Sequence, residues 1–463
     1  MHKTMNWEMA RGILTLAWPT MLEQLMQTAV QYIDTAMVGS LGTQATAAVG
    51  ATATINWLMG SSLAALSVGF LAFIAKSCGA NDIPAAKKAA AQTVLTTLVI
   101  GILFTLLTVG LSGYISVWMQ VDREIRALAG QYFCILYLPM LPRTASILFG
   151  TALRAAGDTR TPMKIGLAVN VINVALNFLL IYPTRTVEIM GLELLVPGTG
   201  WGVLGAAAAS AISFTVGGVA VSVALWRHPL ISPKGSGLRL EPDILLPCLR
   251  VAVPNMLQRF STSLGYVVFA AMINSLGEVA AAAHTIANTV ESAFYIPGYG
   301  MQTAAATLAG NAYGAGDRKR MKELSSMFVP LEMGLMVFSG ALLFVGAPFL
   351  VALFSDAGEV IDLGVTVLRM VALSEPFYGV SIIVEGMMLG VGRTKIPFLY
   401  NISGMWLVRI VGTFLCTQMM GMGLVSAWAC MIAHNLLLCV LYGWSYLRGR
   451  WNPLEWRNHE YHR

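Results

Sequence analysis

Charged residues are scarce in this chain: they make up 11% of its 463 residues, whereas a soluble globular domain carries about a quarter. A soluble fold is therefore excluded, because a core of this size cannot hide so much apolar surface. Cysteine is scarce too, and the six cysteines have no CxxC or other paired spacing, which argues against disulfides and metal sites. The sequence also lacks a Walker motif, so ATP is not expected to be the energy source.

Long apolar runs take the place of the missing charges. Hydrophobic residues form 56% of the chain, and each run is long enough to cross about 30 Å of hydrocarbon. The runs do not alternate as the strands of a membrane β-barrel do. The first run is too long for a signal peptide and is expected to be retained. The sequence predicts an all-α membrane protein with twelve transmembrane helices at 12–38, 45–75, 92–113, 127–150, 163–183, 201–226, 248–273, 280–311, 326–349, 362–390, 397–419 and 424–447.

Basic residues lie mostly on one side of these spans. If the N-terminus is cytoplasmic, cytoplasmic segments hold 22 of the 29 Lys and Arg, among them Lys3, Arg457 and Arg463 near the two ends. The outer loops hold three, and four arginines fall inside spans. The positive-inside rule then predicts that both termini are cytoplasmic. This distribution explains the basic pI without a nucleic-acid partner, and anionic lipid headgroups are the expected contact of the basic loops.

The chain repeats itself at an offset of 235 residues. Pro19 then coincides with Pro254, Ser40-Leu41-Gly42 with Ser275-Leu276-Gly277, and Gly157 with Gly392. Each half holds an even number of spans, so the halves enter the membrane in the same direction. We expect an N-terminal lobe at 1–226, a cytoplasmic linker at 227–247 and a C-terminal lobe with a cytoplasmic tail at 248–463. Two lobes around a cleft suit transport by alternating access, and a duplicated scaffold without a transport role is the alternative.

Asp34 is the clearest ionisable residue inside a predicted span. Its counterpart in the repeat is Phe269, so the charge belongs to one half only. Charges at this depth are costly and usually mark a pathway. A carboxyl group in a poorly hydrated cavity binds a proton because desolvation disfavours its anion, or a sodium ion holds it ionised. The alternative is an aspartate that reaches the outer headgroups.

Amide and hydroxyl side chains are expected to accompany Asp34. Asn173 and Asn177 are four residues apart and share one helical face. Ser210, in the next span, is expected at a comparable depth. Oxygen ligands of this kind suit a hard cation, so Asp34, Asn173 and Asn177 would hold the ion if it is sodium. Hydrogen bonds between helices are the alternative role of the asparagines.

Further acids lie inside the spans. Glu23 precedes Asp34 by three helical turns on nearly the same face. Glu291 and Glu375 lie in spans of the second half and are candidates to line a substrate cleft and attract cations. For each of the three, a structural role is the open alternative.

An ordered set of motifs resembles the multidrug and toxic compound extrusion (MATE) family over essentially the whole chain. The set comprises a proline-led first span with Asp34 before MVGSLG, GANDIPAAKKA and GAGDRKRMKEL, LRAAGDTRTP and LGVGRTKIP, and GVLGAAAAS. The resemblance implies proton- or sodium-coupled export of organic cations and other amphiphilic toxic compounds, from the cytoplasmic membrane of a bacterium. It implies no cofactor besides the coupling ion, no enzyme activity and a monomer.

The same resemblance implies a cation site in the N-terminal lobe at Asp34, Asn173, Asn177 and Ser210. Some members have an aspartate where Asn177 stands, so the choice between proton and sodium stays open. The acids of a C-lobe cation site in other members fall at Thr262 and near Tyr378 here, so that site is expected to be absent. A lipid or lipid-linked precursor flippase is the alternative function. The GAGD segment, which superficially matches the motif of intramembrane aspartyl proteases, is expected to be a loop turn.

Overall fold

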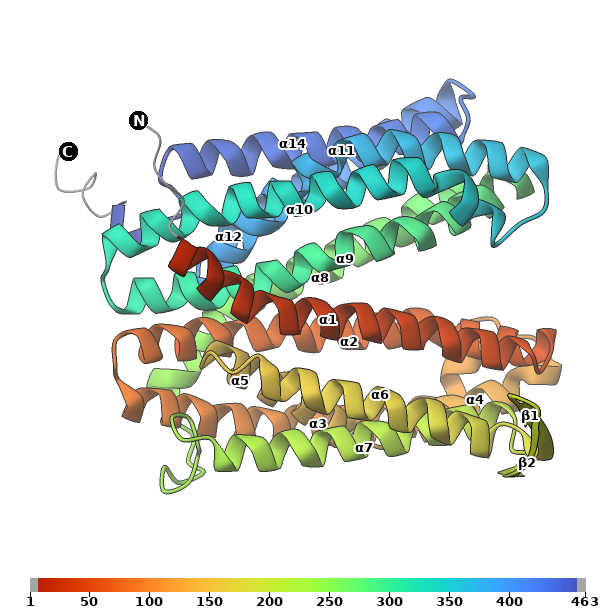
Figure 1. Ribbon diagram of the computed structural model, residues 1–463, viewed down its shortest axis with the longest axis horizontal. Coiled ribbons are helices and arrows are strands. Elements are labelled where there is room, and N and C mark those ends of the chain that lie inside the picture. The colour runs from red at the N-terminus through yellow and green to blue at the C-terminus, as the bar shows by residue number, and fades with distance from the viewer. Residues whose placement is uncertain (1–6, 456–463) are drawn as a thin grey trace. The chain divides into compact units, whose positions relative to one another are not determined.

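The computed structural model describes residues 7–455, apart from the side chains at positions 51 and 54, and consists mainly of long helices (Figure 1). Lys3, Arg457 and Arg463, which the sequence assigns to the cytoplasm, lie outside the described residues. The elements in chain order are α1 (Trp7–Gly39), α2 (Thr43–Gly79), α3 (Ile83–Trp118), α4 (Arg123–Tyr137), α5 (Met140–Ala155), α6 (Arg160–Leu180), β1 (Pro183–Ile189), β2 (Leu192–Thr199), α7 (Val203–Arg227), α8 (Pro242–Asn274), α9 (Glu278–Gly314), α10 (Arg318–Ala352), α11 (Gly358–Gly390), α12 (Lys395–Ile402), the π-helix η1 (Ser403–Ile410), α13 (Val411–Thr413), the π-helix η2 (Phe414–Met419) and α14 (Leu424–Leu447).

Each predicted span coincides with one helix or with consecutive helical segments. Among the described residues, eight helices are long and apolar enough to cross a membrane, and nine if α4 and α5, bent by 47°, form one span. The other predicted spans coincide with α1, α8 and α9, which have 33, 33 and 37 residues and are long enough but less apolar. The sequence predicts one unbroken span at 127–150, whereas the structure breaks it at Pro139, which is not helical (φ −88°, ψ 42°). Proline has no backbone N–H to donate, and its ring clashes with the carbonyl of the preceding turn.

A β-hairpin occupies the long loop that follows α6. β1 pairs antiparallel with β2, with Thr186 opposite Leu195 and Ile189 opposite Leu192. The two residues between the strands, Met190 and Gly191, both have positive φ, at 54° and 81°. That geometry matches the right-handed twist of the strands. The all-α prediction therefore misses this one two-stranded element.

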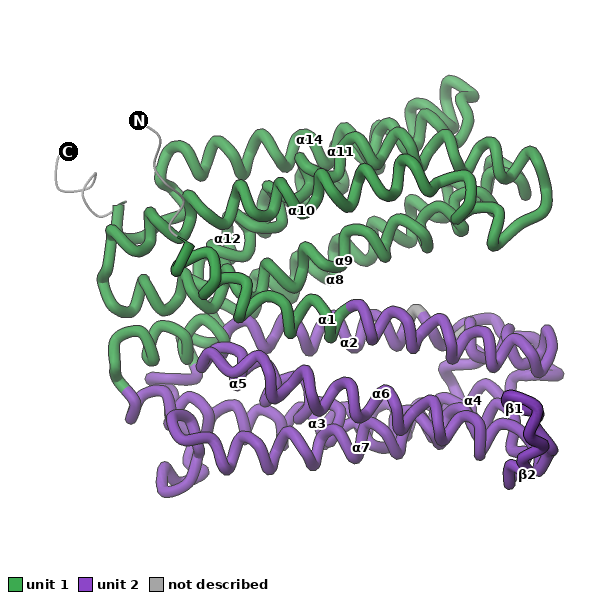
Figure 2. Tube along the Cα trace, viewed as in Figure 1, with its two compact units in different colours: residues 1–24, 71–82, 246–463 green, residues 25–70, 83–245 purple. Residues whose placement is uncertain are grey.

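The chain divides into two compact units (Figure 2). The first-half unit comprises residues 25–70 and 83–245, and the second-half unit comprises 1–24, 71–82 and 246–463. These bounds differ from the expected lobes, because the start of α1 and the end of α2 pack with the second half. The chain between α7 and α8, up to Leu245, belongs instead to the first-half unit.

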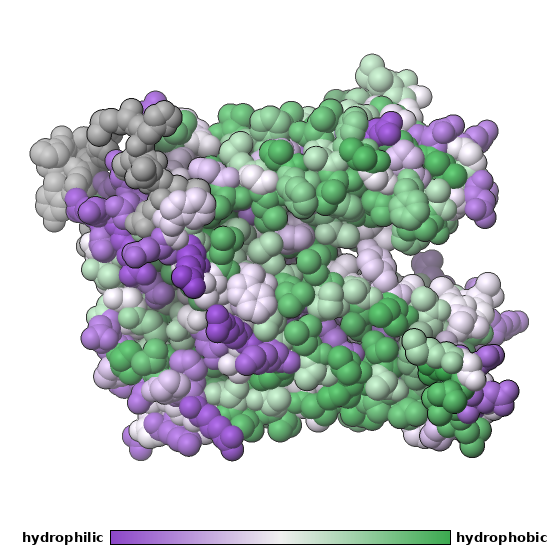
Figure 3. Space-filling model, in the orientation of Figure 1, coloured by the Kyte–Doolittle hydropathy of each residue, from purple (hydrophilic) through white to green (hydrophobic). Residues whose placement is uncertain are grey.

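Helix packing builds each unit around its own core. In the first-half unit, α5 packs between α3 and α7, and α6 packs against α7. In the second-half unit, α11 packs against α9, α10 and α14, and Trp428 and Tyr442 are among its fully buried side chains. Large apolar side chains on the outside, such as Val345 at 78% exposure and Leu106 at 67%, are positioned for contact with lipid. On the face seen in Figure 3, apolar residues cover the middle of the helices of each unit, and hydrophilic residues gather at the helix ends.

The end of α2 crosses α9 at a point where both backbones touch. A Cβ atom on Gly79 would lie 2.0 Å from the Asn311 carbonyl oxygen, and one on Gly314 would lie 1.9 Å from the Lys76 carbonyl oxygen. Gly79 and Gly314 are counterparts at the offset of 235, and so are Lys76 and Asn311. The repeat therefore produces a symmetric crossing within the second-half unit. Small residues allow this close approach of membrane helices.

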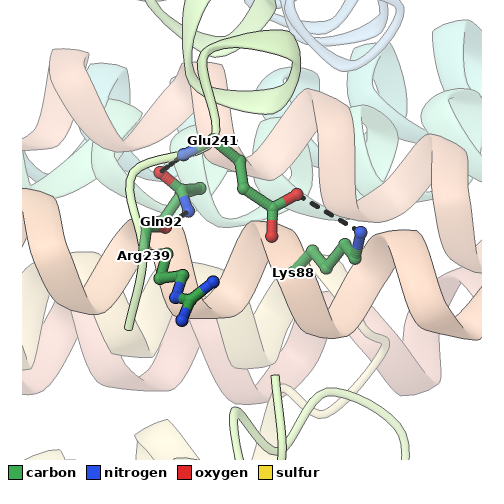
Figure 4. A network of polar contacts seen from close by, with 4 residues as sticks. All are labelled: Lys88, Gln92, Arg239 and Glu241. Atoms are coloured by element: carbon green, nitrogen blue, oxygen red, sulfur yellow. Dashed lines mark hydrogen bonds and ion pairs between the residues drawn. The ribbon is translucent and has the colours of Figure 1, made fainter. Parts of the chain in front are cut away.

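The segment before α8 is attached to α3 (Figure 4). The Gln92 side chain is 1% exposed, and its Nε2 donates to the Arg239 carbonyl at 2.7 Å. Its Oε1 accepts from the Glu241 backbone N–H at 3.2 Å, and Lys88 pairs with the Glu241 carboxylate at 3.3 Å. These contacts explain why the chain up to Leu245 belongs to the first-half unit.

Candidate ion-coupling site

Asp34 lies in the second half of α1 and is the acid of a polar cluster inside the first-half unit. Its carboxylate is half-buried and accepts a hydrogen bond from Nδ2 of Asn177 on α6. The carboxylate therefore points toward α6 rather than to the helix end. This contact disfavours the alternative in which Asp34 only reaches the outer headgroups.

The two asparagines of α6 connect Asp34 to α7. Asn177 Nδ2 also donates to Asn173 Oδ1 at 3.2 Å, and Asn173 Nδ2 donates to the Ser210 hydroxyl at 3.3 Å. When the amide O and N of Asn173 are exchanged, its Nδ2 donates to both Asp34 oxygens at 2.9 and 3.2 Å, and its Oδ1 accepts from Ser210 at 3.3 Å. Both amide orientations join the four residues, so the structure brings together the whole predicted set.

The cluster has spare capacity to bind a cation. Asn173 and Asn177 are 6% and 1% exposed, and Asn177 Oδ1 is buried without a hydrogen-bond partner among the described residues. Buried amide oxygens are normally paired. Carboxylate, amide and hydroxyl oxygens are hard ligands, so Asp34, Asn173 and Asn177 fit a sodium ion. A proton on Asp34 changes the charge of the cluster by the same amount.

The three candidate cleft acids lie in the other unit. Glu23, on α1, is 7% exposed and belongs to the second-half unit, so the unit boundary on α1 separates it from Asp34. Glu291 on α9 and Glu375 on α11 are 6% and 1% exposed and interact electrostatically. Both Glu375 oxygens are buried without a hydrogen-bond partner in the described part of the chain. Within the second-half unit, the structure thus groups Glu291 with Glu375.

Hydroxyl groups stand where the resemblance places the C-lobe acids. Thr262 donates to the Gln258 carbonyl of its own helix at 2.9 Å, and Tyr378 shares a hydrogen bond with Tyr299 at 2.7 Å. A different acid carries the polar contacts nearby: Glu385 accepts from Gln258 Nε2 at 2.7 Å. From the sequence, Glu385 is recognisable only as an acid inside the predicted span 362–390. Its partner on α8 becomes visible only once α8 and α11 are packed together.

Two buried arginines were also recognised from sequence only as charges inside spans. Arg143 on α5 lies 4.8 Å from the ring of Phe214 and 5.7 Å from that of Tyr137. Arg409 on η1 lies 5.1 Å from the rings of both Tyr266 and Phe269. Arginine inside a span is the signal that could have found them. Their aromatic partners come from other helices, which no spacing along the chain reveals.

Comparisons with known proteins identify relatives over the whole chain. The family model described as MatE matches residues 19–179 and again 254–415, and the two matches begin 235 residues apart, which is the offset of the repeat. A Thermotoga maritima protein named "Probable multidrug resistance protein NorM" is 26% identical over 96% of this chain and 93% of its own length. A Bacillus subtilis protein named "Probable multidrug resistance protein YoeA" is 23% identical over 92% of this chain and 91% of its own length.

Solved structures have the same fold. One, described as the outward-facing conformation of a multidrug resistance MATE family transporter of the MOP superfamily, has a TM-score of 0.86 at 21% identity, covering 96% of both chains. A MOP superfamily transporter from Pyrococcus furiosus has a TM-score of 0.86 at 22% identity with the same coverage. The predicted helical membrane fold with two related halves is confirmed. The GAGD motif forms a turn in which Asp317 caps α10 by accepting from the Arg320 N–H at 2.9 Å. Because its family model matches both halves, this chain belongs to the MatE family of membrane transporters and is not an enzyme.

Proposed function

We propose that this protein is a secondary active multidrug exporter that exchanges protons or sodium ions for organic cations and other amphiphilic toxic compounds. The observation that carries this proposal is the Asp34 cluster with Asn173, Asn177 and Ser210. Binding one cation there changes the local charge by one unit. Such a change biases a protein that has two conformations.

The names of the relatives support the export of drugs. The Thermotoga maritima and Bacillus subtilis proteins are both named as multidrug resistance proteins. The exported compounds would include cations, because the second-half unit contains the buried acids Glu291, Glu375 and, from α1, Glu23. Buried carboxylates attract positive charge in a medium of low dielectric constant.

Transport would proceed by alternating access of an N-terminal lobe, 1–226, and a C-terminal lobe, 248–463. Gln92 and Lys88 of α3 hold the linker between these lobes, at Arg239 and Glu241. The protein would lie in the cytoplasmic membrane of a bacterium with both termini inside, as the distribution of Lys and Arg indicates. A monomer is sufficient for this mechanism, since both lobes belong to one chain.

Ethidium transport in liposomes tests the proposal. We expect the wild-type protein to move ethidium under an imposed pH or sodium gradient and Asp34→Asn to lose this movement. Asp122→Asn is a matched control, because it removes one charge from an exposed residue of the same half. Loss of transport with Asp34→Asn alone supports the site, and the active gradient identifies the ion.

Two other outcomes would contradict the proposal. Gradient-driven transport that persists in Asp34→Asn would move the coupling role to another acid, with Glu291 the next candidate. A wild-type protein that moves no ethidium under either gradient would contradict drug export and favour lipid or lipid-linked precursors as substrates.

A further inference from the structure

Arg409 is a buried cation whose hydrogen-bond donors are largely unused. It lies on η1 of the second-half unit and is 4% exposed. Its guanidinium carbon lies 5.1 Å from the ring centres of both Tyr266 and Phe269, which belong to α8. Nε and Nη1 are buried and have no hydrogen-bond partner within residues 7–455. Since arginine stays protonated, this cation needs an anion or dipoles to compensate it.

No neighbouring residue pairs directly with the unused N–H groups of Arg409 in the described part of the chain. Glu291 on α9 interacts with Arg409 electrostatically, but no ion pair joins them in the described part of the chain. His284 is occupied by Trp428, whose Nε1 donates to His284 Nδ1 at 3.2 Å. His434, the other nearby histidine, supplies no negative charge at any pH. The aromatic rings compensate part of the charge by cation–π attraction, and the unused N–H groups remain.

The repeat places this cation beside the positions that correspond to the ion-coupling site. Phe269, which contacts Arg409, is the counterpart of Asp34, and Val408, the residue before Arg409, is the counterpart of Asn173. A carboxylate with amides thus occupies one half, and an aromatic ring with a guanidinium occupies the other. Residues 403–410 form a π-helix, which changes the direction of side chains relative to an α-helix. Such segments are frequent at functional sites.

We propose that Arg409 anchors an anion-binding site in the second half, and that this site takes the carboxylate of an amphiphilic substrate. The assignment rests on the proposed export function and deepens it by naming the acidic part of the substrate. Guanidinium N–H groups match the geometry of a carboxylate, and Tyr266 and Phe269 offer apolar faces beside it. Glu291 would hold the cationic part of the same molecule.

Two dyes that differ only in an acid group test the assignment. Rhodamine 110 carries a cation and a carboxylate, and rhodamine 123 is its methyl ester. Binding to the purified full-length protein in detergent is measured by fluorescence anisotropy at pH 7.5. We expect the wild-type protein to bind rhodamine 110 about tenfold more tightly than rhodamine 123, because a charge-assisted hydrogen bond between Arg409 and the carboxylate contributes about this much. Arg409→Gln should lose this preference, and Arg409→Lys should retain a smaller part of it.

A matched control separates this site from a general effect of charge. Arg369→Gln removes another arginine of the same half, one that is exposed, lies 5.2 Å from the Phe344 ring and donates to the Phe344 carbonyl at 3.3 Å. It should keep the full preference for rhodamine 110. If Arg409→Gln fails to fold, Arg409→Lys and the ratio in the wild-type protein still decide the question.

The contrary outcomes are distinct. Equal binding of the two dyes by the wild-type protein, or a preference that survives in Arg409→Gln, would overturn this assignment alone. A protein that binds neither dye would overturn it together with drug export. A lipid phosphate is the other source of such an anion. Equal dye binding, combined with a thermal stabilisation by phosphatidylglycerol that disappears in Arg409→Gln, would assign the anion to lipid and overturn the substrate assignment.

Discussion

The two halves of this protein share their packing but not their charges. At the α2–α9 crossing, the repeat produces two equivalent contacts: Gly79 approaches Asn311, and their counterparts Gly314 and Lys76 approach one another. At the polar sites the counterparts differ, because Asp34 on α1 corresponds to Phe269 on α8. A duplicated fold therefore needs the same small residues at its helix contacts, while each half is free to acquire a different charge.

On the basis of this difference, we propose separate tasks for the halves. The first half has an acid surrounded by amides, which suits a proton or a sodium ion. The second half has a buried arginine with several buried acids, which suits the charged groups of an organic substrate. Substitutions at the crossing test what the two halves share, and substitutions at the polar cluster and the linker test what only the first half possesses.

The largest effect is expected at the crossing. Gly314→Val places a side chain where a Cβ atom alone would lie 1.9 Å from the Lys76 carbonyl, and overpacking of this kind costs roughly 1–3 kcal/mol or more. Gly79→Val should cost a similar amount, because the contact is symmetric. Gly334→Ala is the control, since a Cβ there meets nothing within 4 Å among the described residues. Thermal unfolding of the three variants in detergent, monitored by size-exclusion chromatography of heated samples, measures the destabilisation. Unequal destabilisation by Gly79→Val and Gly314→Val would contradict the equivalence of the two contacts.

The next effect is expected at the acid of the first half. Asn177→Ala removes the amide that donates to Asp34 and Asn173. Hydrogen bonds to charged groups contribute about 1.5–3 kcal/mol, so the affinity for the coupling ion should change by tenfold or more. Asn170→Ala is matched to it, because Asn170 lies on the same helix and its Nδ2 has no partner within residues 7–455. Ion-dependent ethidium binding measures the change, and equal effects of both variants would count against the site.

A smaller effect is expected at Gln92, which attaches the linker to α3 of the first half. Gln92 has Met327 as its counterpart, so the contacts with Arg239 and Glu241 have no equivalent in the second half. Gln92→Ala should destabilise the protein by about 1–3 kcal/mol, because it leaves buried backbone groups unpaired. Limited proteolysis of the 228–245 segment would detect its release. A linker that stays as resistant as in the wild-type protein would contradict this role.

The smallest effect is expected at the exposed ion pair of the same linker. Lys88 and Glu241 are partly exposed, at 49% and 30% of their side chains, and such pairs contribute about 0–1 kcal/mol. Glu241→Gln should therefore release the linker less than Gln92→Ala does in the same proteolysis assay. The opposite order would show that the charge, rather than the buried amide, attaches the segment.

The helices were predictable from sequence because length and hydropathy determine them. The twelve predicted spans coincide with helical segments, and the offset that relates Pro19 to Pro254 recurs in the family match. The break at Pro139 and the hairpin at Met190 and Gly191 had local signals, a proline and a glycine-containing turn. They were missed because hydropathy dominates the pattern there.

The polar site was predictable only in part. The charge of Asp34 inside a span and the spacing of Asn173 and Asn177 indicated these residues, and the family resemblance implied one cation site that also includes Ser210. The structure joins the four by hydrogen bonds. Spacing also placed Glu23 on the face of Asp34, yet the boundary between units separates them. Helical periodicity describes one helix, whereas the surroundings of Glu23 and Arg409 depend on which helices pack against them. The π-helix that carries Arg409 has no signal in hydropathy.

The dependence of ethidium binding on the coupling ion tests the central claim most directly. Ethidium affinity of the purified protein would be titrated against pH and sodium, in the wild-type protein, Asp34→Asn and Asp122→Asn. Two ligands that influence one another's affinity do so reciprocally. In an exchanger the ion and the drug oppose one another, so the wild-type protein and Asp122→Asn should bind ethidium less tightly as the concentration of the coupling ion rises. Asp34→Asn should bind it with an affinity that no longer responds to the ion. An undiminished response in Asp34→Asn would contradict the assignment of ion coupling to the first half.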